Sequence, residues 1–331
     1  MGPARSLLAA SILSTSILTL TNCGTSISPT TAFFAPQAAT TLWLIIDIPN
    51  EIYAYPIGGT GATTPSNIIT LPASLSAEHI AIDDTGNLYV VTNADIREYA
   101  ANATGTATPI RVIPEDSATV PIAGLAVDAS GNIYVSVQNQ GILIFSSTAN
   151  GNATPSRTIL GDSQPGGGLS TIQNPSALAT DSAGNLYVAN ISGVQNSVLV
   201  FGPTANGNVA PIRTLIADPG WMAVDPAGNI YLYPYVVSGS DQGLQIAVFA
   251  AGATGIATPV RTVAPFSGVY GLAVDPVGNI YAEIGSNPFF PYCDGSNIDE
   301  YAPTASGNAI PNATYPGGGF PCSGSPSIAV H

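Results

Sequence analysis

The residue types that perform most enzyme chemistry are scarce in this chain. Histidine occurs only twice, as His79 and His331. A zinc site or a lyase built on imidazoles needs more histidines than these two positions supply. A serine triad would have His79 as its one realistic base, and the sequence contains no G-x-S-x-G turn to present a nucleophile. The sequence therefore favours a non-catalytic protein over an enzyme.

Carboxylates are the other candidates for chemistry. Glu78 precedes His79, and Glu283 stands where related segments carry small or uncharged residues. Together with asparagines, the two glutamates could supply oxygen ligands to Ca²⁺ or Mg²⁺. Their spacing does not indicate such a site. We expect no cofactor and no metal centre, with an oxygen-ligand cation as the alternative.

Five aspartates belong to a repeated unit. Its first half reads GLAVDASGNIYV at 124–135, and its second half reads QGILIFSSTANGNATPSRTIL at 140–160. The unit recurs every 44–53 residues and has four short apolar runs without helical periodicity. Four strands in a repeat of this length predict one blade of a β-propeller. The aspartates are Asp83, Asp128, Asp181, Asp225 and Asp275.

The two ends of the repeat region complete each other. The segment SPSIAVH at 325–331 has only a first strand, whereas LWLIIDIPNEIYAYP at 42–56 has a second and a third strand but no first. Joined, they make one blade and close the sheet edges. We therefore expect an all-β fold over residues 41–331: a six-bladed β-propeller of four-stranded antiparallel blades, closed by the C-terminal strand pairing into the first blade.

The motif AVDxxGNIYV followed by xxVF and AxGNxxPxRTI resembles the NHL repeat over residues 42–331. It is also similar to the gluconolactonase, streptogramin-lyase and TolB-like propellers. The resemblance implies the propeller fold. It leaves function open, because this group includes metal-dependent lactonases, lyases that rely on several histidines, and pure binding modules.

Three residue types recur at fixed places in the units, and we expect all three to be structural. The aspartate should cap a tight turn, since aspartates spread round a ring cannot converge on one ion. The arginine should hold a backbone carbonyl or an acidic partner at a blade edge, and the aromatic residue should pack between blades. The arginines are Arg111, Arg157, Arg213 and Arg261, with Asn67 and Asn312 expected at this place in blades one and six; the aromatic residues are Trp43, Tyr89, Tyr134, Tyr187, Tyr231 and Tyr281.

The two ends of the predicted disc differ. One end, the regular face, carries the D-x-x-G-N turns and A-x-G-N loops. The other, the irregular face, carries the loops between second and third strands and the connections between blades, which vary in length. Loops carry specificity, so we expect the binding surface on the irregular face, toward blades four to six. Cys293 and Cys322 lie in two of its segments, and an oxidising compartment favours a disulfide between them over two free thiols.

The ligand-binding candidates form two groups. Aromatic residues of the irregular loops suit sugar rings or apolar groups of a partner, or else pack the loops onto the disc. Four residues near the start of the innermost strands break a small-residue pattern, and Glu283 stands where other blades have uncharged residues. Together they either form a polar and aromatic pocket at the channel mouth or reflect neutral drift. The first group is Tyr233, Tyr235, Phe289, Phe290 and Tyr292; the second is Glu78, His79, Trp221, Tyr270 and Glu283.

The first 22 residues have the pattern of an export signal. Arg5 supplies a positive start, and the apolar stretch Ser6–Leu20 is short for a bilayer span. The segment before Cys23 resembles the bacterial lipobox, although Asn22 departs from it. We expect lipidation of Cys23, a flexible tether over 23–40, and an outer-membrane or cell-surface lipoprotein. The alternative is cleavage near Ala38, which gives a secreted protein.

The charge balance limits the partners. The chain has no lysine, six arginines and 20 carboxylates, for a net charge of −14. Such a surface repels nucleic acid and anionic lipid, so a membrane would be reached only through the lipid. We expect a monomeric, extracytoplasmic binding module for a glycan, a peptide or an envelope protein. The alternatives are a metal-assisted lactonase, hydrolase or lyase at the channel mouth, and a structural surface scaffold.

Overall fold

Every regular element that the structure describes is a β-strand, and the strands form six sheets of four. This computed structural model describes residues 41–46, 50–58, 64–114, 122–192, 194–234, 244–265, 267–285, 297–316 and 328–331. All of them belong to one unit, Pro36–His331. The predicted signal peptide, the predicted tether and Cys23 lie outside the described residues. No helix in the described part of the chain is long and apolar enough to cross a membrane.

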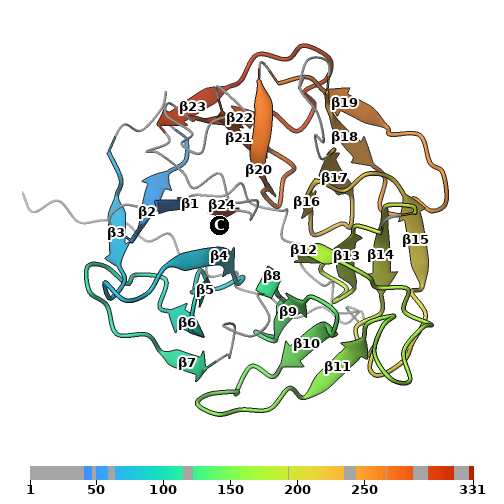
Figure 1. Ribbon diagram of the computed structural model, residues 1–331. Coiled ribbons are helices and arrows are strands. Elements are labelled where there is room, and N and C mark those ends of the chain that lie inside the picture. Colours follow the sequence, from blue (N-terminus) through green and yellow to red (C-terminus); the bar gives the residue numbers. More distant parts are fainter. Residues whose placement is uncertain are drawn as a thin grey trace, which may run out of the picture. The chain divides into compact units, whose positions relative to one another are not determined.

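Each sheet is one antiparallel blade, and the blades follow one another round a ring (Figure 1). From the innermost strand outward, blade one is β24 (Ile328–Val330), β1 (Thr41–Ile46), β2 (Glu51–Pro56) and β3 (Asn67–Thr70). Blade two is β4 (Ala77–Ile82), β5 (Leu88–Thr92), β6 (Asp95–Tyr99) and β7 (Arg111–Pro114). Blade three is β8 (Ile122–Val127), β9 (Ile133–Val137), β10 (Gly141–Phe145) and β11 (Arg157–Leu160).

The remaining blades repeat this order. Blade four is β12 (Pro175–Thr180), β13 (Leu186–Asn190), β14 (Ser197–Phe201) and β15 (Arg213–Ile216). Blade five is β16 (Trp221–Val224), β17 (Ile230–Tyr233), β18 (Ile246–Phe249) and β19 (Arg261–Val263). Blade six is β20 (Gly268–Val274), β21 (Ile280–Gly285), β22 (Asn297–Tyr301) and β23 (Ala313–Pro316). The predicted six-bladed β-propeller is confirmed.

The ring closes as the sequence predicts. Strand β24 pairs antiparallel with β1, with Leu42 opposite Val330 and Leu44 opposite Ile328. Beyond this ladder, the backbones of Thr41 and His331 exchange hydrogen bonds of 2.8 and 2.9 Å. Leu42 and Leu44 are fully buried, so β24 completes both the hydrogen bonding and the packing of blade one.

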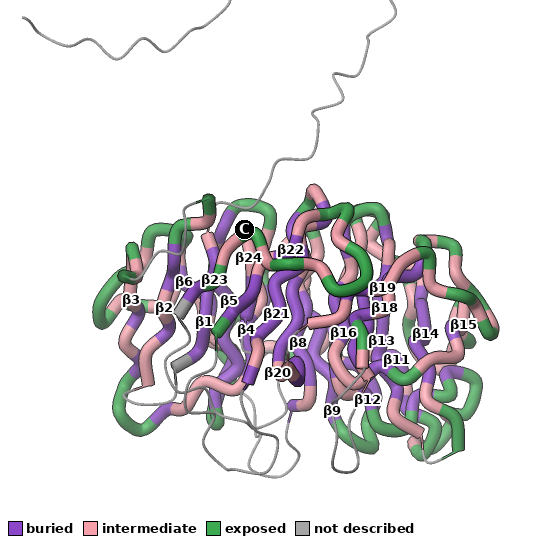
Figure 2. Tube along the Cα trace, turned by 90° about the horizontal axis from the view of Figure 1, so that it is seen from above, coloured by how far each residue is buried: buried purple, intermediate pink, exposed green. Residues whose placement is uncertain are grey.

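The core lies between the blades rather than at one centre. The second strands of blades two, three and four are buried along their whole length, and exposed residues gather at the turns (Figure 2). The aromatic residue of each second strand packs against the blade that follows: Tyr89 of blade two contacts the cluster that contains Leu125 and Ile133 of blade three. Trp43 packs in the same way against Ile80 and Leu88 of blade two. The predicted inter-blade packing is confirmed.

The repeated aspartate caps its turn, as expected. In blade three, Oδ1 of Asp128 accepts hydrogen bonds of 2.9 Å from the backbone N–H groups of Ser130 and Asn132. Its Oδ2 accepts from the side chains of Asn132 and Tyr134, both at 2.9 Å. Gly131 has φ +76°, which favours glycine. Both carboxylate oxygens are used within the turn.

The repeated arginine ties its blade to the next one. Nη1 of Arg157 donates to the carbonyls of Pro203 and Ala205 in blade four, at 2.7 and 3.1 Å. Nη2 donates to the hydroxyl of Tyr134 at 3.3 Å, and the guanidinium carbon lies 5.9 Å from that ring's centroid. We call this arrangement the arginine latch. Arg111, Arg213 and Arg261 repeat the ring contact and donate to backbone carbonyls of the following blade.

One expected equivalence is wrong. Arg157 stands opposite Ile144 in its blade, and Asn67 stands opposite Ala54 in the same way. In blade six this place falls to Ala313, opposite Glu300, and not to Asn312. Asn312 follows the proline directly, one residue too early for the register.

Replacing Arg157 with leucine removes one latch. We expect the free energy of unfolding to fall by about 2 kcal/mol, because two charged hydrogen bonds and a ring contact are lost together. The melting temperature should drop by about 4–8 °C. Calorimetry on the purified protein measures it. Arg157→Lys is the matched control and should lose only part of this stability. Equal stability of all three proteins would contradict the latch.

Deleting residues 328–331 should destabilise the whole ring and not only its last strand. The deletion exposes the edge of β1 and the buried Leu42 and Leu44. We expect a large drop in melting temperature by circular dichroism. A synthetic peptide of sequence SPSIAVH should restore part of it, and an unchanged melting curve for the deletion would show that closure contributes nothing.

Candidate functional site

The innermost strands share an irregularity near their starts, at the irregular face. The pairing register of four of them shifts by one residue there, as between Ala77 and His79 in β4 and between Val269 and Gly271 in β20. The extra residues are Glu78 and Tyr270 in these strands, and Ala123 and Ser176 in β8 and β12. Bulges of this kind re-aim side chains and are common beside functional sites.

Three candidate residues at this end of the innermost strands are partly exposed. Glu78 and Tyr270 are bulge residues, and Trp221 opens β16. Burial raises the pKa of the Glu78 carboxyl above its usual value. The ring of Tyr270 covers Gly285, where a Cβ would come within 2.6 Å of a ring carbon. These residues offer an acid and two aromatic surfaces from blades two, five and six.

His79 is a buried, structural histidine. It is 2 % exposed, and its Nε2 lies 3.1 Å from the carbonyl oxygen of Ile122 in blade three. Because that carbonyl only accepts, Nε2 carries the proton. Burial lowers the pKa of His79 to about 4, against the smaller opposing effect of this hydrogen bond. The imidazole is therefore neutral at neutral pH and joins two blades.

Glu283 and Tyr233 are also buried, at 2 % and 1 % exposed. Tyr233 stands opposite Trp221 and packs in the cluster between blades five and six. The expectation of an exposed Tyr233 ring is therefore wrong: the alternation of β17 points it to the same side as Tyr231. Glu283 stands opposite Gly271. It lies on the same side of β21 as Tyr281, and that side faces blade one.

Three of the second group of candidates lie at different blade junctions. His79 lies at the junction of blades two and three, Trp221 at that of blades five and six, and Glu283 at that of blades six and one. What they share is a layer near the irregular face. Of the other predictions, Tyr235, Phe289, Phe290, Tyr292, Cys293 and Cys322 lie outside the described residues.

Sequence reasoning missed Ser136, which belongs to the same layer. It is fully buried opposite Gly124, where a Cβ would lie 3.1 Å from its Oγ. Comparing the second strands position by position would have found it, because Ser136 stands where blade six has Glu283. Across the described ranges, no group of three or more His, Cys, Asp or Glu side chains could hold a metal ion. The absence of a cofactor stays a prediction.

The buried His79 makes stability depend on pH. Its pKa in the folded chain, about 4, lies below the ordinary value of 6.5. The stability that this neutral imidazole contributes to the folded chain is present above pH 6.5 and is lost as the pH falls toward 4. Between these two pH values the imidazole takes up a proton in the unfolded chain but not in the folded one. Between pH 7 and pH 5 the free energy of unfolding should fall by about 2 kcal/mol more in the unmodified protein than in H79Q. The amide of H79Q can still donate to the carbonyl of Ile122. Urea unfolding measures this, with H331Q as control, and equal losses would contradict a buried neutral imidazole.

Comparisons with known proteins agree on the fold and go no further. No family model matches the sequence, and the search of curated proteins gives no match. A solved protein of unknown function from Bacteroides caccae is similar, with a TM-score of 0.57 and 11% identity over 88% of this chain and 99% of that one. The Pan2 WD40 domain of Neurospora crassa matches with a TM-score of 0.50 and 11% identity, over 86% of this chain and 76% of that one. At this identity the likeness shows that the chain folds as a β-propeller.

Proposed function

We propose that this protein is a non-catalytic binding module outside the cytoplasm. Its irregular face holds a glycan, a peptide or an envelope protein, around the starts of the innermost strands. A lipid on Cys23 anchors it to the outer membrane or cell surface, and a Cys293–Cys322 disulfide joins two irregular segments. The export pattern of residues 1–22 supports the location. The varied lengths of the loops on the irregular face support the choice of that face.

One observation carries the proposal. The repeated polar residues serve the scaffold: the aspartates cap turns and the arginines latch blades together. Glu78, Trp221 and Tyr270 break the repeat, are partly exposed, and lie at the irregular end of three innermost strands. An acid can hydrogen-bond a sugar or peptide, and aromatic surfaces can cover its apolar parts.

The buried His79 argues against the catalytic alternative. A general base must reach the proton that it removes. His79 is 2 % exposed, and its protonated Nε2 already serves the carbonyl of Ile122. The other histidine, His331, contacts the carbonyl of Asp84 at the regular face, 3.3 Å away. Neither imidazole supports a lyase or a serine hydrolase at the irregular end.

Binding arrays test the proposal directly. The processed protein, purified in detergent, is screened on arrays of glycans and of peptides. For a ligand found there, W221L should raise the dissociation constant about tenfold, through loss of one aromatic contact. E78Q and Y270L should also weaken binding, through loss of the carboxylate and of the second aromatic surface. I212S changes a residue 60 % exposed on the outer edge and should bind as the unmodified protein does.

The outcomes separate the candidate functions. Weakened binding in the three variants, with unchanged melting temperatures, supports the irregular face as the binding surface. Binding that is insensitive to all three places the ligand elsewhere. Absence of any ligand on both arrays favours the scaffold, and a stoichiometric metal with lactone hydrolysis favours the enzyme.

A further inference from the structure

The junction between blades one and two lacks the arginine latch. The register places three different residues where blade three has its latch: Trp43 for Tyr134, Asn67 for Arg157 and His331 for Asp128. The equivalence of the last pair follows from the backbone. His331 and Thr41 exchange hydrogen bonds of 2.9 and 2.8 Å, and in blade three the N–H of Asp128 donates across the turn to the carbonyl of Asn132 at 3.1 Å.

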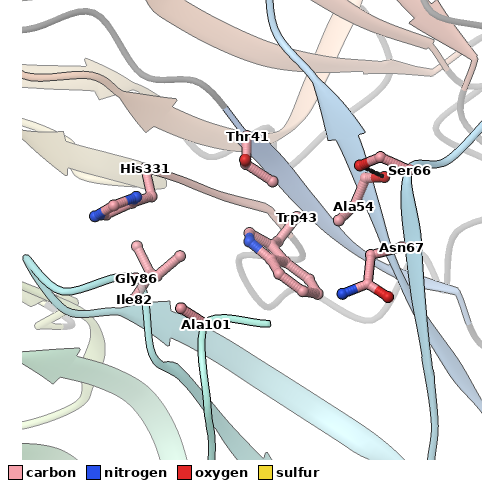
Figure 3. A pocket seen from close by; sticks show the side chains of 9 residues that line it. All are labelled: Thr41, Trp43, Ala54, Ser66, Asn67, Ile82, Gly86, Ala101 and His331. Carbon is pink, nitrogen blue, oxygen red and sulfur yellow. Dashed lines mark hydrogen bonds between the residues drawn. The ribbon is translucent and has the colours of Figure 1, made fainter. Parts of the chain in front are cut away.

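A pocket of about 190 Å³ lies at this junction, on the regular face. Figure 3 shows Trp43 between Asn67 on one side and Ile82, Gly86 and Ala101 on the other. The lining therefore comes from both blades. It is remote from the bulges of the irregular face, so this site and the proposed binding surface are independent.

The four junctions that follow, from blades two and three to blades five and six, show what fills the equivalent place. There a guanidinium carbon stands 5.7–5.9 Å from the tyrosine ring centroid. Its Nη1 donates to a carbonyl of the next blade, as Arg157 does to Pro203 at 2.7 Å and Arg111 to Ser147 at 2.7 Å. Ala101 is the blade-two residue that corresponds to Ser147 and Pro203.

Asn67 is too short to repeat this contact. Its Nδ2 donates to the carbonyl of Ala103, the counterpart of the second acceptor in the latch. Within the residues that the structure describes, no donor reaches the carbonyl of Ala101. The junction thus keeps an aromatic face and a carbonyl acceptor but has lost the cation that uses them elsewhere.

We propose that this pocket binds a guanidinium group, in the form of an arginine side chain presented by a peptide or partner protein. Indole is the best aromatic face for a cation, and Trp43, which replaces tyrosine here, borders the pocket with the 3 % of its surface that is exposed. A net charge of −14 attracts cations to the surface. At the position of Ala54 the Arg157 and Arg213 latches have Ile144 and Val200, so no carboxylate is needed there. Because His331 replaces the turn aspartate of those latches, this pocket offers a guanidinium an aromatic face and a carbonyl rather than an ion pair.

Fluorescence of Trp43 in the processed protein tests the proposal. W221F leaves Trp43 as the only tryptophan, since the chain has two. N-acetylarginine amide should change its emission saturably, with a dissociation constant on the order of 1 mM. The citrulline analogue has the same shape without the charge and should bind at least about tenfold more weakly. No saturable change with the arginine probe, or an equal change with citrulline, would overturn the proposal.

A variant that supplies its own guanidinium provides the second test. N67R should rebuild the latch, raise the melting temperature and abolish the response to the arginine probe. I212R is the matched control: it adds an arginine at a residue 60 % exposed in blade four, away from the pocket, and should bind the probe as the unmodified protein does. Full binding to a folded N67R would place the probe elsewhere. A Gly-Arg-Gly peptide and free methylguanidine separate the sources: tighter binding of the peptide supports a protein partner, and equal binding supports only the free group.

Discussion

Each blade of this protein buries both of its faces only because another blade lies on either side. The second strands β5 and β9 are buried on both sides, and their tyrosines belong to the clusters that they share with the next blade. A twisted sheet of this kind has no stable existence alone, since either face would meet water. The ring must therefore close, and β24 closes it by pairing with β1.

A second constraint follows from burying tyrosines at these junctions. A buried hydroxyl needs hydrogen-bond partners, and burial raises the pKa of Tyr134. The aspartate of the turn accepts from this hydroxyl, and the arginine donates to it and continues to the carbonyls of the following blade. Turn, ring and neighbouring blade are thus connected by one chain of polar contacts, which the sequence repeats with little change.

The chain departs from this pattern at both sides of blade one, which is built from the two ends of the propeller. Toward blade two, Asn67 replaces the arginine. From blade six, Ala313 stands at its place, and the hydroxyl of Tyr315 donates to Glu300 at 2.8 Å instead. The repeat is thus most altered at the blade where the chain meets itself.

The sequence predicted the scaffold well and the candidate site only in part. The Asp128 turn, the Arg157 latch and the Trp43 packing were predicted, because turn chemistry and register repeat in every unit. Tyr233 was expected to be exposed, although it is buried. Its place beside irregular loops indicated nothing about which side of β17 it faces. His79 and Glu283 stood out from the repeat, but the pattern could not show that both are buried.

The sequence by itself determined the strands, the turns that join them and the six blades, since these depend on alternation and turn residues within a few positions of each other. Only the tertiary structure decided the environment of each polar residue. That His79 meets the carbonyl of Ile122, and that Trp43 and Asn67 border a pocket with Ala101, depends on side chains of the next blade. Those neighbours lie tens of residues away, and their distance and orientation are set by the packing of one sheet against another.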